Sequence, residues 1–127
     1  MSANSVIVKL PAWILLTGLL IFLSLIDFKA MISAPMIQQD RFLHLLVFAF
    51  FMGVTRYLLP NLSMGWVAVL SFSIGLLIEV LQKYYTHGIR HFTLTDLFYN
   101  LMGIALGLIL LILFRRFKAV KIPTTSR

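Results

Sequence analysis

Four long apolar stretches dominate the hydrophobic pattern of this chain. They run over residues 10–26, 42–59, 62–81 and 94–114, and short polar segments separate them. A helix needs roughly 20 residues to cross a hydrocarbon core of about 30 Å, and each stretch is close to that length. Proline at 60 and glycine at 88 fall in the segments between stretches, where they favour turns. The pattern predicts one all-α domain over residues 1–127, a polytopic membrane protein folded as a bundle of four transmembrane helices.

The composition supports this prediction and excludes several other classes of protein. Of the 127 residues, 61% are hydrophobic and 12% are charged, whereas soluble domains are about 45–50% apolar and about 25% charged. The balance excludes a disordered or collagen-like chain and argues against an ordinary soluble globule. Because the chain has no cysteine, it has no disulfide, thiolate metal site or cysteine nucleophile. We expect no cofactor, and the one weak metal pattern is His87-x-x-x-His91 with Asp96.

The distribution of basic residues predicts the orientation of the bundle. With an even number of spans both termini share one side, and that side collects seven basic residues: Lys9, Arg56, Arg115, Arg116, Lys118, Lys121 and Arg127. The opposite side collects four: Lys29, Arg41, Lys83 and Arg90. Cytoplasmic flanks carry the excess of positive charge, so we expect both termini in the cytoplasm and the first stretch to be an uncleaved anchor. The net charge of +7 then belongs to a membrane flank, and no nucleic-acid partner is expected.

Small residues in two of the stretches predict close contacts between helices. Gly103 and Gly107 form a G-x-x-x-G pair, and Ser71 and Gly75 repeat the spacing. Small residues four apart let helices approach closely in lipid, where the hydrophobic effect no longer drives their association. Two interpretations stay open at this point: packing within one bundle, or the face of a homo-oligomer.

Eight polar residues are predicted to gather at the extracytoplasmic face. Successive spans alternate in direction, so the start of the second, the end of the third and the start of the fourth share that face. The residues are Asp40, Arg41, His44, Glu79, Gln82, Arg90, Asp96 and Asn100. Several of them are three or four positions apart, so they lie on one side of a helix. Ionisable groups at membrane depth are costly unless paired or hydrated, and the cluster therefore predicts a polar pocket.

Three of these residues also have a purely structural interpretation. Thr93-x-x-Asp96 fits a capping box at the start of a helix. Glu79 could form a purely structural ion pair with Arg90 or Arg41, and His44 could be a hydrogen-bonded histidine inside the bundle. Lys9, Lys29 and Arg56 fit interface anchors.

These positions resemble the VanZ-like family of small bacterial membrane proteins. The matching residues are Asp40-Arg41-x-x-His44-x-x-x-Phe48, Gly75-x-x-x-Glu79-x-x-Gln82, Arg90 and Thr93-x-x-Asp96-x-x-x-Asn100-x-x-Gly103-x-x-x-Gly107, over residues 40–107. The chain has arginine at 41 and threonine at 93, where the family more often has lysine and serine. The resemblance implies a multi-pass protein of the bacterial cytoplasmic (inner) membrane and cell envelope. The family's namesake is linked to low-level resistance to the glycopeptide antibiotic teicoplanin, but the resemblance implies no established reaction and no catalytic residue.

Three functions fit these observations. In the leading one, the outward pocket binds an amphiphilic envelope molecule: a lipid-linked precursor, a lipid head group or a lipoglycopeptide. Arg41 and Arg90 would hold its phosphate or carboxylate, because a guanidinium binds such groups in bidentate fashion. In the second, a carboxylate and His44 supply acid–base catalysis on a lipid-linked substrate. In the third, the protein is a structural accessory subunit whose polar face only holds the bundle together.

Overall fold

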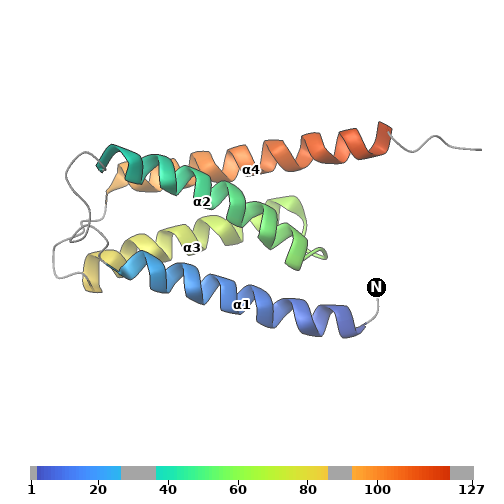
Figure 1. Cartoon of the computed structure of the whole chain (residues 1–127), viewed down its shortest axis with the longest axis horizontal. Coiled ribbons are helices and arrows are strands. Elements are labelled where there is room, and N and C mark those ends of the chain that lie inside the picture. Colours follow the sequence, from blue (N-terminus) through green and yellow to red (C-terminus); the bar gives the residue numbers. More distant parts are fainter. Residues whose placement is uncertain (1–2, 27–36, 86–92, 121–127) are drawn as a thin grey trace, which may run out of the picture.

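The computed structural model describes residues 3–26, 37–85 and 93–120. They form four helices: α1 (Ala3–Leu25), α2 (Ile37–Leu58), α3 (Met64–Tyr85) and α4 (Leu94–Val120). The helices run alternately in opposite directions, so α1 and α3 end where α2 and α4 begin (Figure 1). The all-helical prediction is confirmed for the described residues, in which no strand occurs.

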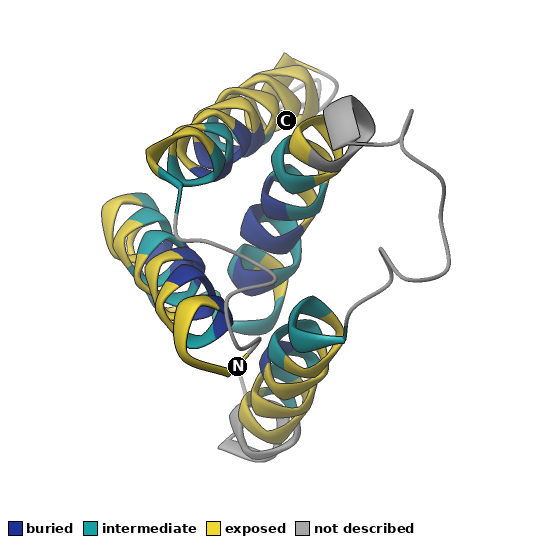
Figure 2. Cartoon of the chain, turned by 90° about the vertical axis from the view of Figure 1, so that its left-hand side faces the viewer, coloured by how far each residue is buried: buried dark blue, intermediate teal, exposed yellow. Residues whose placement is uncertain are grey.

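The four helices do not contact one another equally. α2 and α4 share the most extensive interface, and α3 packs against both of them. α1 packs on α2 and α3 and makes no contact with α4 in the described part of the chain. Seen from the end where α2 and α4 begin, the buried positions face the middle of the bundle (Figure 2).

The helices extend beyond the apolar stretches at several ends. α3 continues to Tyr85, four residues beyond the apolar stretch that ends at 81. α4 likewise continues past 114 to Val120. Polar residues end an apolar stretch without ending the backbone hydrogen bonding of a helix. Ser63 caps the start of α3, because its hydroxyl accepts a hydrogen bond from the Trp66 N–H at 3.3 Å.

Three helices are long and apolar enough to cross a membrane: α2 over Arg41–Leu58, α3 and α4. In α1 the apolar part is the shorter segment Lys9–Leu25. The outward side chains are largely apolar, whereas the buried part of the described chain contains six hydrophobic residues and six polar ones beside three glycines. The buried polar residues are Thr17, Thr55, Ser71, Glu79, Gln82 and Asn100. An apolar outside around a half-polar inside reverses the usual arrangement of a soluble bundle.

The interface between α2 and α4 is made by the two glycines of the G-x-x-x-G pair. A Cβ on Gly103 would lie 2.3 Å from the carbonyl oxygen of Leu45, and one on Gly107 would lie 2.8 Å from that of Ala49. No real side chain fits at such distances, so the backbones of the two helices meet there. The glycine pair therefore brings two helices of the same chain together, as the first of the two interpretations predicted.

Arg56 closes the turn between α2 and α3. Its Nη1 donates to the carbonyl oxygens of Pro60, at 2.7 Å, and Leu62. These carbonyls follow the last turn of α2, where backbone acceptors lack helical partners. The residue expected to be an interface anchor thus also shapes the short connection.

Candidate functional site

A buried polar layer lies near the end of the bundle where α2 and α4 begin and α3 ends. We define this layer by four residues: His44 on α2, Glu79 and Gln82 on α3, and Asn100 on α4. Glu79 and Asn100 are 0% exposed and Gln82 is 3% exposed, while His44 is half-buried. Of the eight residues predicted for the polar pocket, three are therefore buried inside the bundle and a fourth, His44, is half-buried beside them.

His44 and Asn100 join α2 to α4 through a hydrogen bond. His44 Nδ1 and Asn100 Oδ1 are 2.9 Å apart. The amide oxygen can only accept, so the proton of this bond belongs to Nδ1. In the neutral ring Nε2 is then the acceptor. The contact fixes the ring of His44 against a fully buried amide.

The nitrogen of the Asn100 amide lies in different surroundings from the oxygen. Its Nδ2 is buried and has no hydrogen-bond partner among the described residues. It lies beside the backbone of α3, since a Cβ on Gly75 would be 3.3 Å from this nitrogen and 3.1 Å from two ring atoms of Phe48. Gly75 thus lets the amide and the aromatic ring approach α3 closely. A buried donor without an acceptor costs about 1–3 kcal/mol, so a group outside the described residues is expected to supply one.

Glu79 and Gln82 bring the end of α3 into the interior. Both side chains lie on the face that also buries Gly75 and Ile78, as their helical spacing requires. Gln82 Nε2 donates to the backbone carbonyl of Ser24 at 2.9 Å, which ties α3 to the last turn of α1. Glu79 is 0% exposed, so its carboxyl group lies wholly inside the bundle.

Asp96 lies at the start of α4 and is half-buried. Its backbone N–H donates to the Thr93 hydroxyl at 3.2 Å, which is the first half of the capping box expected for Thr93-x-x-Asp96. Asp96 also stands four residues before Asn100, on the same side of α4. Its position near a helix N-terminus favours the negative charge.

The remaining predicted residues are not brought into the polar layer by the described structure. Arg41 is exposed, one turn before His44 on α2. Asp40 belongs to the first turn of α2, and its side chain lies outside the described part. Arg90 and the pair His87 and His91 also lie outside it. Within the described ranges no group of three metal-ligating side chains converges.

Sequence reasoning missed two further polar contacts between helices. Trp13 Nε1 on α1 donates to Thr55 Oγ1 on α2 at 3.1 Å, and Thr55 is fully buried. Ser71 Oγ lies 3.9 Å from Met52 Sδ in the interior. Thr55 falls on the same face of α2 as His44 and Phe48, eleven and seven residues away, so helical spacing could have placed it. The carbonyl of Ser24 had no such signal, because a backbone acceptor is not visible in a side-chain pattern.

The described hydrogen bond of His44 joins its ring to the amide oxygen of Asn100. A carboxylate-oriented histidine, which general base catalysis commonly uses, is not among the contacts of the described residues. Hydrogen-bond donors and acceptors at one end of an apolar bundle suit the polar part of an amphiphile.

Compared with protein-family models, with curated proteins and with solved structures, the chain matches none. The VanZ-like resemblance stays a prediction that rests on the motifs over residues 40–107.

Proposed function

We propose that the protein crosses the bacterial cytoplasmic membrane four times, with both termini in the cytoplasm. Three helices have the length and hydropathy for this, and the apolar segment Lys9–Leu25 of α1 is at the short end of the range of about 17–25 residues for a span. The apolar outer surface fits a lipid environment. The excess of basic residues at the end opposite the polar layer supports a cytoplasmic location for that end.

We further propose that the protein is a VanZ-like envelope protein whose polar layer binds the head of an amphiphilic envelope molecule. One observation carries this proposal: the buried Asn100 Nδ2 has no acceptor among the described residues. A hydroxyl, carbonyl or phosphate oxygen of a ligand would supply that acceptor. Ligands of this class are lipid-linked precursors, lipid head groups and lipoglycopeptides such as teicoplanin.

The surroundings of Asn100 offer separate places for the polar part and the apolar part of such a ligand. Arg41, exposed one turn nearer the membrane surface than His44, would hold a phosphate or carboxylate at the rim. The exposed apolar side chains of Phe42 and Phe98 stand beside this end of α2 and α4, where acyl chains would run. Polar recognition would thus occur inside the bundle and apolar contact outside it.

Binding measurements on the purified protein in lipid nanodiscs test this proposal. The probes are undecaprenyl phosphate and teicoplanin. Their binding is measured by titration onto immobilised nanodiscs or by native mass spectrometry. We expect at least one probe to bind, Asn100→Leu to weaken its binding by tenfold or more, and Arg41→Gln to weaken it less. Thr55→Val, which also replaces a buried polar group but at a distance from the layer, is the matched control and should bind as the wild type does.

Two results would reject the proposal. Equal binding by wild type and Asn100→Leu, with Arg41→Gln also unchanged, would remove the layer from recognition. Loss of binding by Thr55→Val to the same extent would show that any disturbance of the bundle interior suffices. In either case the polar layer would serve only to hold helices together, as interhelical hydrogen bonds do in membranes.

A further inference from the structure

The end of the bundle opposite the polar layer carries a concentration of positive charge. Five basic residues of the described chain belong to it: Lys9 on α1, Arg56 on α2, and Arg115, Arg116 and Lys118 on α4. The four acidic residues of the sequence, Asp27, Asp40, Glu79 and Asp96, follow or lie in the opposite ends of the helices. No carboxylate therefore neutralises these cations within the described residues.

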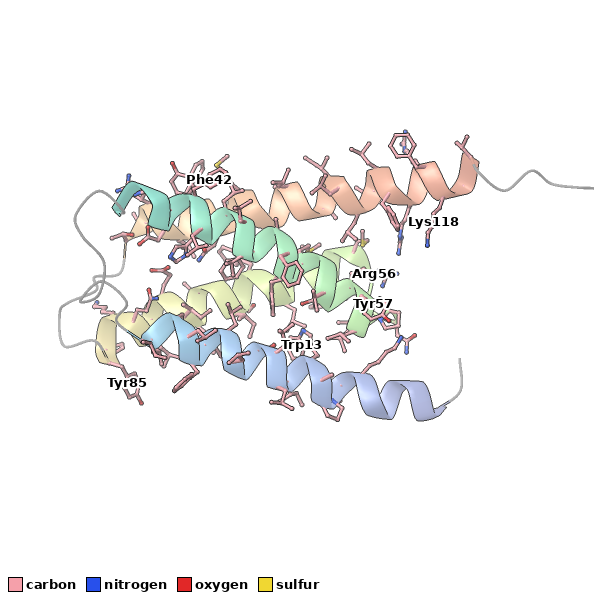
Figure 3. All side chains as sticks on the ribbon, in the orientation of Figure 1. Trp13, Phe42, Arg56, Tyr57, Tyr85 and Lys118 are labelled. Atoms are coloured by element: carbon pink, nitrogen blue, oxygen red, sulfur yellow. The ribbon has the colours of Figure 1, made fainter. Side chains whose placement is uncertain are left out.

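The cations at this end of the bundle lie on both sides of the turn between α2 and α3. α1 and α4 extend further than the turn between α2 and α3, which is set back between them (Figure 1). Arg56 and Tyr57 lie at this end together with Lys118, far from Phe42 and Tyr85 (Figure 3). Lys9 and Lys118 thus stand on the two longer helices, and Arg56 stands at the turn.

Aromatic rings lie beside these cations, and two of the cations contact a ring. Lys9 Nζ lies 5.1 Å from the centre of the Tyr57 ring, a contact between α1 and α2. Lys118 Nζ lies 5.0 Å from the ring centre of Phe114. Tyr57 and Trp66 are exposed, at 71% and 65%. Exposed tyrosine and tryptophan at one level of a bundle are typical of the interface between hydrocarbon and head groups.

Helix length places the cations at that same level. The apolar part of α4 before Arg115 contains 21 residues, from Leu94 to Phe114, which corresponds to about 31 Å of helix. This matches a hydrocarbon core of about 30 Å, so Arg115, Arg116 and Lys118 reach the head-group region of one leaflet. The phosphates of anionic lipids lie at this depth and attract lysine and arginine.

We propose that this end of the bundle, formed by Lys9, Arg56 and Lys118 with Tyr57, binds anionic phospholipids. Lipid phosphates would lie beside the cations of α1 and α4, two helices that do not contact each other in the described part of the chain, and the acyl chains would run along the exposed apolar faces of the helices. Arg56 already uses Nη1 on two carbonyl groups, so Lys9 and Lys118 make the adjustable contacts. The inference rests on the proposed membrane insertion, which alkaline extraction of membranes tests separately.

Titration of lipids onto the detergent-purified full chain tests this site, with native mass spectrometry as the readout. The probes are phosphatidylglycerol, cardiolipin and the zwitterionic phosphatidylcholine. We expect the two anionic lipids to bind more tightly than phosphatidylcholine. Lys9→Gln and Lys118→Gln should each weaken the anionic lipids by about fivefold, and the double variant should weaken them further.

Lys83→Gln is the matched control for Lys9→Gln. Lys83 also lies over an exposed tyrosine ring, with Nζ 6.0 Å from the centre of Tyr84, but at the opposite end of the bundle. The control should bind anionic lipids as the wild type does, and all variants should keep the melting temperature of the lipid-free protein.

Three results would overturn the inference. One is unchanged lipid binding by the double variant, and another is an equal loss in Lys83→Gln, which would indicate attraction by net charge alone. The third is complete competition by millimolar inorganic phosphate, which would indicate a site for the free anion rather than for a lipid. None of these results bears on the binding of undecaprenyl phosphate or teicoplanin by the polar layer, which Asn100→Leu tests.

Discussion

Replacing Gly103 by alanine is expected to destabilise the bundle by about 1–3 kcal/mol, the range for overpacked sites. The new Cβ would lie 2.3 Å from the Leu45 carbonyl oxygen and 3.0 Å from the Phe48 Cβ. A backbone carbonyl cannot rotate away as a side chain can, so α4 must move off α2. Such a shift would also loosen the contact of Gly107 with Ala49 one turn further along.

Two other glycines provide matched controls for this substitution. Gly18 on α1 and Gly53 on α2 lie within helices, and a Cβ on either would meet no atom within 4 Å. Alanine has a better helix propensity than glycine by up to about 1 kcal/mol, so Gly18→Ala and Gly53→Ala should be neutral or stabilising. Unfolding in mixed micelles, followed by circular dichroism, measures all three. Equal stability of Gly103→Ala and the controls would contradict the close approach of α2 and α4.

Removing either partner of the hydrogen bond between His44 and Asn100 is expected to destabilise the fold by about 1–3 kcal/mol. His44→Phe should be the more damaging, because it leaves Asn100 Oδ1 without its described partner at a position that is 0% exposed. Asn100→Leu leaves the half-buried ring of His44, which water can reach more easily. The double variant should lose less stability than the sum of the two, with a coupling of about 1 kcal/mol.

A second cycle, His44→Phe with Thr55→Val, controls for general loosening of α2. The two residues are eleven positions apart on one helix, or about 16 Å. Substitutions so far apart usually add within about 0.3–0.5 kcal/mol. Additivity in the first cycle would mean that His44 and Asn100 do not meet, whereas coupling in both cycles would mean that α2 responds as a whole.

The apolar stretches predicted the four helices that the described residues form and their order, because long apolar segments separated by polar ones indicate the helices directly. The helix ends at Tyr85 and Val120 could not be read in the same way, since hydropathy reports the environment of a residue and helices continue into polar surroundings. The spacing of Gly103 and Gly107 indicated a close contact but not its partner. The choice of α2 follows from the fold, which places Leu45 and Ala49 opposite the two glycines.

The polar layer was predicted less completely than the helices. Spacing within each helix placed Glu79 with Gln82 and Asp96 with Asn100 on shared faces. The pairing of His44 with Asn100, 56 residues apart, depends on the relative height of α2 and α4, which no local pattern reports. The bond from Gln82 to the Ser24 carbonyl depends on a backbone atom at the end of α1.

Cysteine labelling in intact spheroplasts tests most directly the claim that the polar layer faces the outside of the cell. The chain has no cysteine, so a single one at Gly88, between α3 and α4, or at Asn61, in the exposed turn between α2 and α3, gives a signal without background. A membrane-impermeant maleimide should label Gly88→Cys in intact spheroplasts and label Asn61→Cys only after the membrane is permeabilised. Labelling of Asn61→Cys but not Gly88→Cys in intact spheroplasts would place the polar layer on the cytoplasmic side and contradict the account.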